Sequence, residues 1–176
     1  MIKPLFNSIL VVINGSEASI QAAQYGILMA RLYRCDMKAI YVVDTVTLKE
    51  LTISKFFVAE ESLDYEDCLT EDGKRYLSYV ENLAKAKGIK IETELRKGSV
   101  WSEVVNFASE SKTDLILLGE HQHNENKDVI TSSYKEIISC LKDRFSVFWV
   151  ADSLCVIVFG LFLLLDFLLK YFPFTL

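Results

Sequence analysis

Glycine, proline and histidine are all scarce in this chain, which has seven, two and two of them in 176 residues. No Walker motif and no long glycine-rich loop is present, which excludes the usual P-loop site for nucleotides. None of the four cysteines has a partner at CxxC spacing, so no zinc or redox motif is indicated. We expect reduced and mostly buried thiols in an intracellular protein.

Basic residues are also outnumbered, with 19 Lys and Arg against 24 Asp and Glu and a formal net charge of -5. Binding to nucleic acid needs clustered Lys and Arg, so a nucleic-acid partner is not expected. The hydrophobic fraction is 51%, and much of it lies after Ala151. We therefore predict a domain over residues 1–152 and a hydrophobic C-terminal tail over residues 153–176.

Strand-like and helix-like segments alternate through the predicted domain. Residues 8–13 form an apolar, β-branched run that is typical of a strand covered on both faces. Ser16 suits an N-cap, and Glu17 suits the first turn of a helix. Helical spacing then predicts a helix as far as about Arg34, along the row Ala18, Ala22, Tyr25, Met29 and Leu32.

The rest of the domain repeats this pattern, with a long interruption. Residues 45–69 are irregular and acidic, and we expect a long loop there with at most a short helical turn. A helix follows from about Thr70, with Gly88 as its expected C′ residue. Further strands are predicted at 38–43, 89–95, 114–118 and 145–150, and further helices from Ser99 and from about residue 129.

Alternating strands and helices predict an α/β domain with a parallel sheet and helices on both faces. In such sheets a ligand binds beyond the carboxyl ends of the strands, where the strand order reverses. Here those ends are Asn14–Gly15, Asp44 and the loop after Gly119. A candidate site is thus placed from the pattern of elements alone.

Three segments give the chain a resemblance to a known family. Residues 9–17 (ILVVINGSE), 40–44 (IYVVD) and 113–119 (TDLILLG) resemble the first, second and fourth strands of universal stress proteins. The resemblance implies a three-layer, doubly wound, five-stranded parallel sheet of the adenine nucleotide alpha hydrolase-like type, with strand order 3-2-1-4-5. It also implies a homodimer that pairs its last strands, here Phe145 to Val150, an apolar edge that would otherwise be exposed.

The ATP-binding members of that family have three glycines and a hydroxyl residue after the fourth strand. On this sequence the glycine positions fall on Gly119, Gln122 and Ser132, and the hydroxyl position falls on Ser133. Glycines at such positions let backbone N–H groups approach phosphates, and Gln122 would crowd that approach. Asn14 also stands where the family usually has Asp.

The resemblance assigns a binding site for an adenine nucleotide, ATP or AMP with Mg²⁺, to positions that this chain only partly retains. The acidic side chains Glu120, Glu125 and Asp128 would oppose a triphosphate. A simpler explanation is a turn glycine with an N-cap at 14–16, and a helix cap at Ser132 or Ser133. The candidate cofactor-binding residues are Asn14, Gly15, Ser16, Val42, Gly119, Ser132 and Ser133.

Catalytic and metal chemistry have little support in the sequence. His121 and His123 could share a metal with Glu120 or Glu125, but a third ligand at motif spacing is not evident. A solvated polar loop explains them as well, and a metal-dependent hydrolase would require them to bind metal. No nucleophile, base and orienting group stand at recognisable spacing, so we expect no catalysis and no metal.

The tail from Ser153 to Phe172 is apolar on all sides, apart from Asp166 and Lys170. A helix of that length would span about 30 Å, the thickness of a bilayer core. A membrane anchor holding a cytoplasmic domain, a helix buried in an oligomer interface and a terminus with no selected role all remain open.

Together these features predict a non-catalytic universal stress protein-like module with a regulatory or stress-response role, dimeric and tethered to a membrane if the tail inserts. The alternative is a switch that binds ATP or AMP at the strand ends.

Overall fold

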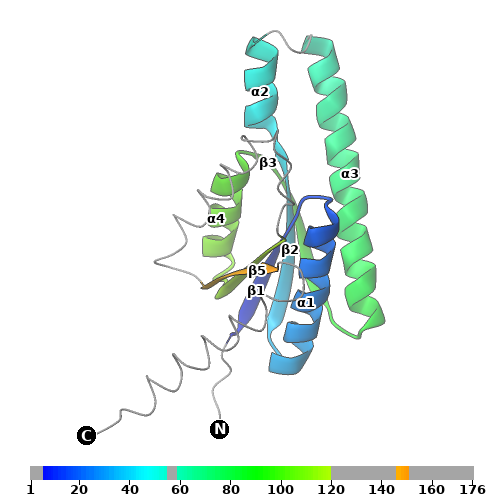
Figure 1. Cartoon of the computed structure of the whole chain (residues 1–176), viewed down its shortest axis with the longest axis vertical. Coiled ribbons are helices and arrows are strands. Elements are labelled where there is room, and N and C mark those ends of the chain that lie inside the picture. The colour runs from blue at the N-terminus through cyan, green and yellow to red at the C-terminus, as the bar shows by residue number, and fades with distance from the viewer. Residues whose placement is uncertain (1–5, 55–58, 120–145, 151–176) are drawn as a thin grey trace, which may run out of the picture.

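The structure is a computed structural model that describes residues 6–54, 59–119 and 146–150. Five strands form a parallel sheet in the order β3-β2-β1-β4-β5 (Figure 1). The predicted α/β class and parallel sheet are confirmed. The strands are β1 (Ser8–Ile13), β2 (Asp36–Asp44), β3 (Ile91–Gly98), β4 (Leu115–Gly119) and β5 (Ser146–Val150).

Four helices are described, and they cover both faces of the sheet. Figure 1 shows α1 and α3 together on one face and α4 on the other. This arrangement is expected when right-handed crossovers first run from β1 towards β3 and then reverse towards β4. The helices are α1 (Glu17–Tyr33), α2 (Thr45–Ile53), α3 (Ala59–Ala86) and α4 (Val100–Glu110).

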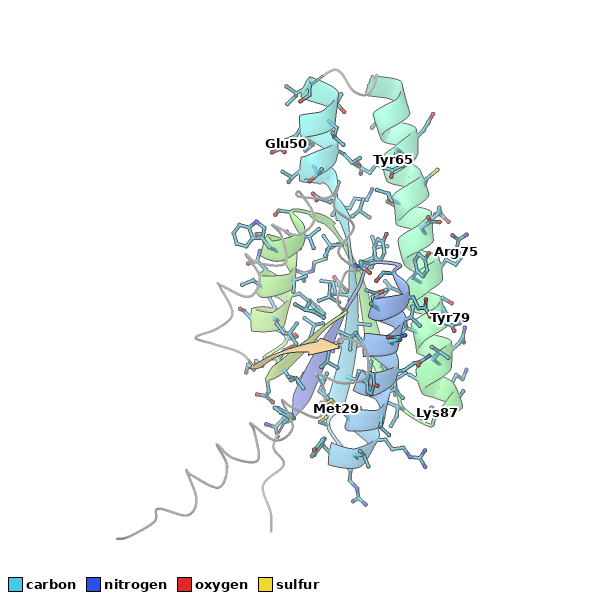
Figure 2. The ribbon with its side chains drawn as sticks, in the orientation of Figure 1. Met29, Glu50, Tyr65, Arg75, Tyr79 and Lys87 are labelled. Carbon is cyan, nitrogen blue, oxygen red and sulfur yellow. The ribbon has the colours of Figure 1, made fainter. Side chains whose placement is uncertain are left out.

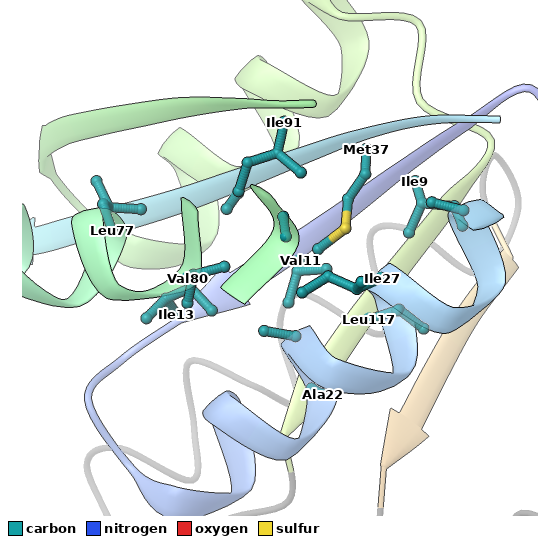
Figure 3. Close-up of a cluster of buried hydrophobic side chains, with 14 of the residues drawn as sticks. Ile9, Val11, Ile13, Ala22, Ile27, Met37, Leu77, Val80, Ile91 and Leu117 are labelled. Atoms are coloured by element: carbon teal, nitrogen blue, oxygen red, sulfur yellow. The ribbon is translucent and has the colours of Figure 1, made fainter. Parts of the chain in front are cut away.

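The central strand β1 is buried along its whole length. It pairs with β2 on one edge and with β4 on the other. Val11 and Ile13 face the larger core, where they meet Ala22 and Ile27 of α1 and Val80 of α3 (Figure 3). Its alternate side chains face a second cluster under α4, which comprises Leu10, Val12, Ile40, Val104, Phe107, Ala108, Ile116 and Leu118.

Helix ends follow the predicted capping residues. Ser16 is the N-cap of α1, where its Oγ accepts a hydrogen bond from the backbone N–H of Ser19 at 3.1 Å. Gly88 has φ +73° after α3, and the N–H of Ile89 donates to the carbonyl of Ala84 at 3.0 Å. A positive φ and this backward hydrogen bond are typical of a helix terminated by a C′ glycine.

The expected long loop over residues 45–69 is wrong, because most of this stretch is helical. Asp44 caps α2 by accepting hydrogen bonds from the N–H and the hydroxyl of Thr47, at 3.1 and 2.6 Å. The helix α3 begins at Ala59 rather than near Thr70. Glu66, on its early turns, forms a 2.8 Å ion pair with Lys97 of β3.

The acidic residues suggested a loop because this part of α3 has little apolar surface to bury. Figure 1 shows α2 and the first turns of α3 extending past the end of the sheet. There Asp64 and Asp67 are exposed, and so is Cys68. The expectation of mostly buried thiols is therefore wrong for Cys68, whereas Cys35 is half-buried and both thiols are free.

Further along, α3 packs flat on the sheet and shows the expected buried stripe. Leu77, Val80 and Ala84 are buried. The opposite side of the helix carries Arg75 and Tyr79, which point away from the sheet in Figure 2.

Several predicted features lie outside the described residues. They include the fourth-strand loop at 120–128, the helix from about residue 129, the domain boundary at 152 and the tail at 153–176. Among the helices that the structure describes, none is long and apolar enough to cross a membrane.

Gly73 allows α3 to lie close to β2. A Cβ at this position would stand 2.6 Å from Cδ1 and 2.8 Å from Cε1 of the buried Tyr41 ring. We predict that Gly73→Ala lowers the free energy of unfolding by about 1–3 kcal/mol through overpacking, although alanine favours a helix by about 1 kcal/mol. Urea unfolding measures this change.

A double-mutant cycle with Tyr41→Ala provides the control, since removal of the ring removes the clash. Gly73→Ala should then be neutral or stabilising. An equal loss in both backgrounds would contradict the assigned contact.

Candidate functional site

The turn between β1 and α1 lies at the carboxyl edge of the sheet, where the strand order reverses. The Oδ1 atom of Asn14 accepts hydrogen bonds from the N–H and the hydroxyl of Ser16, at 3.0 and 2.7 Å. The hydroxyl of Ser19 donates to the Ser16 carbonyl at 2.7 Å. Asn14, Gly15 and Ser16, all half-buried, therefore form a turn that satisfies much of its own hydrogen bonding.

Gly15 is required in this turn for two independent reasons. Its φ of +80° is unfavourable for residues with a Cβ. A Cβ here would also lie 2.7 Å from Cε2 of Tyr76, which comes from α3. The Tyr76 ring thus closes the turn from the α3 side.

Tyr76 is a site residue that the sequence did not assign to the site. Its ring stacks on that of Tyr41, with centroids 6.4 Å apart and an interplanar angle of 12°. Burial raises the pKa of the Tyr41 hydroxyl, and the nearby Asp72 carboxylate adds to the shift. The helical stripe predicted that Tyr76 faces the sheet, but nothing in the sequence predicted which turn it would meet.

Gly119 ends β4 directly beside the first turn of α1. A Cβ on Gly119 would overlap the backbone atoms of Ala18 and Ser19. Glycine is needed here so that the strand and the helix can meet, and no phosphate group fits between them. Any phosphate contact of Gly119 would have to lie on the side of residues 120–133, which are outside the described residues.

The other candidate residues are not brought to this turn. The side chain of Val42 is half-buried and packs with the cluster under α4, on the face of the sheet opposite Tyr41. Ser132 and Ser133 lie outside the described residues, as do His121 and His123. In residues 6–54, 59–119 and 146–150, no group of three or more His, Cys, Asp or Glu is placed to hold a metal ion.

The neighbouring strand ends complete this edge of the sheet. Asp44 ends β2 opposite Gly98 of β3 and is occupied as the cap of α2. Ser99 precedes α4 as its N-cap residue but makes no side-chain capping hydrogen bond. Acidic and hydroxyl groups therefore predominate here, and the exposed Lys97 forms an ion pair with Glu66.

Comparison with known proteins decides the family. The signature of the Universal stress protein family matches residues 5–139. The chain belongs to the universal stress protein family. Universal stress protein MJ0531 from Methanocaldococcus jannaschii is 34% identical over 116 residues, which span 65% of this chain and 65% of that protein.

Solved structures share the fold, and several of them are universal stress proteins. Hypothetical protein MJ0577 superposes with a TM-score of 0.67 at 22% identity and covers 85% of this chain and 99% of its own. A universal stress protein in complex with cAMP gives a TM-score of 0.56 at 17% identity, covering 84% and 98% of the two chains. The Arabidopsis thaliana protein At3g01520, with AMP bound, gives 0.53 at 10% identity, covering 84% and 93%.

The described residues fit only part of a nucleotide site of this family. Gly15 and Gly119 keep the strand ends tightly packed, and Asn14 presents an amide at the turn. The N–H groups of Ser16 and Ser19 are already engaged by side chains. The positions that the family resemblance assigns to the phosphates, within residues 119–133, lie beyond Gly119 outside the described residues.

The contact of Gly119 with α1 generates a prediction. Gly119→Ala should lower the free energy of unfolding by about 3 kcal/mol, because the atoms it would overlap are backbone atoms that cannot rotate away. Chemical denaturation measures the loss. The same loss should persist in an Ala18→Gly background, since the side chain at 18 plays no part. Rescue by Ala18→Gly would show that the contact is assigned to the wrong atoms.

Proposed function

We propose that this chain is a non-catalytic regulatory module of the universal stress protein family with little affinity for ATP. The observation that carries the proposal is the tight packing of the turn at residues 14–16. The side chains of Asn14 and Ser16 accept hydrogen bonds from the N–H groups of Ser16 and Ser19, so these two donors are not available to an anion, and Gly119 packs directly against α1.

The sequence beyond β4 supports the same proposal. Gln122 and Ser132 stand at two of the three positions where ATP-binding relatives have glycine. Side chains there would keep backbone N–H groups away from phosphates. The acidic residues Glu120, Glu125 and Asp128 add repulsion that a triphosphate feels more strongly than a monophosphate.

A second candidate function is a switch that responds to a smaller adenine nucleotide. It is favoured by the structural neighbours that were solved with AMP and with cAMP. One phosphate group places fewer demands on the region of Gln122 and Ser132. Asn14 would then contact the base or the ribose at the edge of the sheet.

Thermal unfolding of the full chain with ATP, AMP or cAMP, with and without Mg²⁺, separates these functions. A ligand at 100 times its Kd adds about 2.7 kcal/mol of stability, which corresponds to a rise in Tm of roughly 5–10 °C at this size. We predict no shift with millimolar ATP. A shift with AMP or cAMP alone would favour the switch.

The double variant Gln122→Gly with Ser132→Gly tests whether the side chains at these two positions prevent ATP from binding. If side chains block the phosphates, this variant should gain an ATP-dependent shift in Tm, and a further Ser133→Ala change should weaken it. A wild-type chain that binds ATP as tightly as the variant would contradict the proposal.

We also propose that the module acts as a homodimer. Its support is that β5 is an edge strand of the described sheet, beside β4. Unpaired edges are prone to pair with another chain. Light scattering on the full chain should give the mass of two chains, and a single-chain mass at every concentration would contradict the dimer.

A further inference from the structure

One side of α1 carries large apolar side chains in contact with solvent. Tyr25, Leu28 and Leu32 are 40%, 52% and 68% exposed. Their spacing of three, four and seven residues places them in one row along the helix, hereafter the outer row. Single apolar residues on a surface need no explanation, but a continuous row of them indicates a covered surface.

The outer row lies on the side of α1 opposite its buried residues, which are Ser19, Ala22, Ala23, Gly26, Ile27 and Ala30. A helix that covers this row must therefore pack beside α1. On one flank of α1 that place is taken by α3, which lies over β2 and β3. The flank over β4 and β5 is left, where α1 contacts both strands.

No described helix lies over β5 on this face. The crossovers that follow β1 and β2 place α1 and α3 on it, and the crossover back to β4 places α4 on the other. Right-handedness assigns the next connection, from β4 to β5, to the α4 face as well. In the part of the chain that is described, the principal neighbours of β5 are β4 and α1.

We propose that residues 153–172 of the same chain form a helix that lies beside α1 over β5 and covers the outer row. Two residues separate this segment from the end of β5 at Val150, a usual length for a strand-to-helix connection. A helix of this length would extend about 30 Å, against about 25 Å for the 17 residues of α1. Its apolar surface then meets both the sheet and the outer row.

The position of the first charged residue in the tail favours a protein surface over a lipid one. From Ser153 to Asp166 a helix advances about 20 Å, and the five residues of β5 span about 17 Å. Asp166 and Lys170 would therefore emerge in water at the far edge of the sheet, where α1 ends beside the exposed Arg34. A bilayer span would instead hold Asp166 within the hydrocarbon core, at a considerable cost.

Cross-linking in the full chain tests this placement. Cys155 is the native thiol of the tail, and Cys35, Cys68 and Cys140 would be replaced by Ser. Gln21→Cys then places a second thiol in the outer row, one turn before Tyr25. Ile20→Cys places one at the neighbouring, half-buried position, whose side chain packs against the larger core instead. A short bismaleimide should join Cys155 to position 21 within one chain far more than to position 20, as quantified by peptide mass spectrometry.

Three outcomes would overturn the proposal. Equal cross-linking at positions 21 and 20 would show that the tail does not recognise the outer row. Cross-links between two chains, seen as a doubled mass, would identify a second copy as the occupant. A carbonate-resistant membrane fraction without the intrachain cross-link would identify a lipid anchor.

Two exposed leucines provide a second, independent test. Leu32 in the outer row and Leu63 on α3 are 68% and 65% exposed. If the tail covers Leu32, then Leu32→Glu should lower the Tm of the full chain by roughly 5 °C, whereas Leu63→Glu should leave it nearly unchanged. Equal effects of the two changes would overturn the proposal.

Discussion

The complete burial of β1 is the constraint on which the rest of the structure depends. All six residues are buried, and both edges of the strand are paired. The chain must therefore leave β1 in a tight turn and start α1 immediately, against the end of β4. The same constraint that stabilises the core brings the β1–α1 turn and the end of β4 into close contact at this edge of the sheet.

The predictions above rest on different kinds of sequence information. The strands could be predicted because both faces of the sheet are covered, so that Leu10 and Val11 are equally buried and the run is continuously apolar. The helix α2 and the start of α3 could not, because they bury little apolar surface: Leu48 is the one buried residue of α2, and Leu63 and Tyr65 of α3 are exposed. Such segments leave no apolar period in the sequence.

The candidate site shows the same division. Ser16 as a cap and Gly15 as a turn residue follow from local chemistry, which the sequence carries directly. Tyr76 over Gly15 and Ala18 beside Gly119 are contacts between elements distant in the chain. Their existence depends on how helices are placed over the sheet, and one sequence taken alone holds no record of that placement.

Two stacked tyrosine rings lie between two glycines. Gly15 lies against the ring of Tyr76, Tyr76 stacks on Tyr41, and Gly73 lies against the ring of Tyr41. Each glycine leaves room for one ring, and each ring supports the other. These four positions, from a turn, a strand and a helix, must therefore change size together during evolution. A family member that acquires a side chain at the position of Gly73 should carry a smaller residue at that of Tyr41.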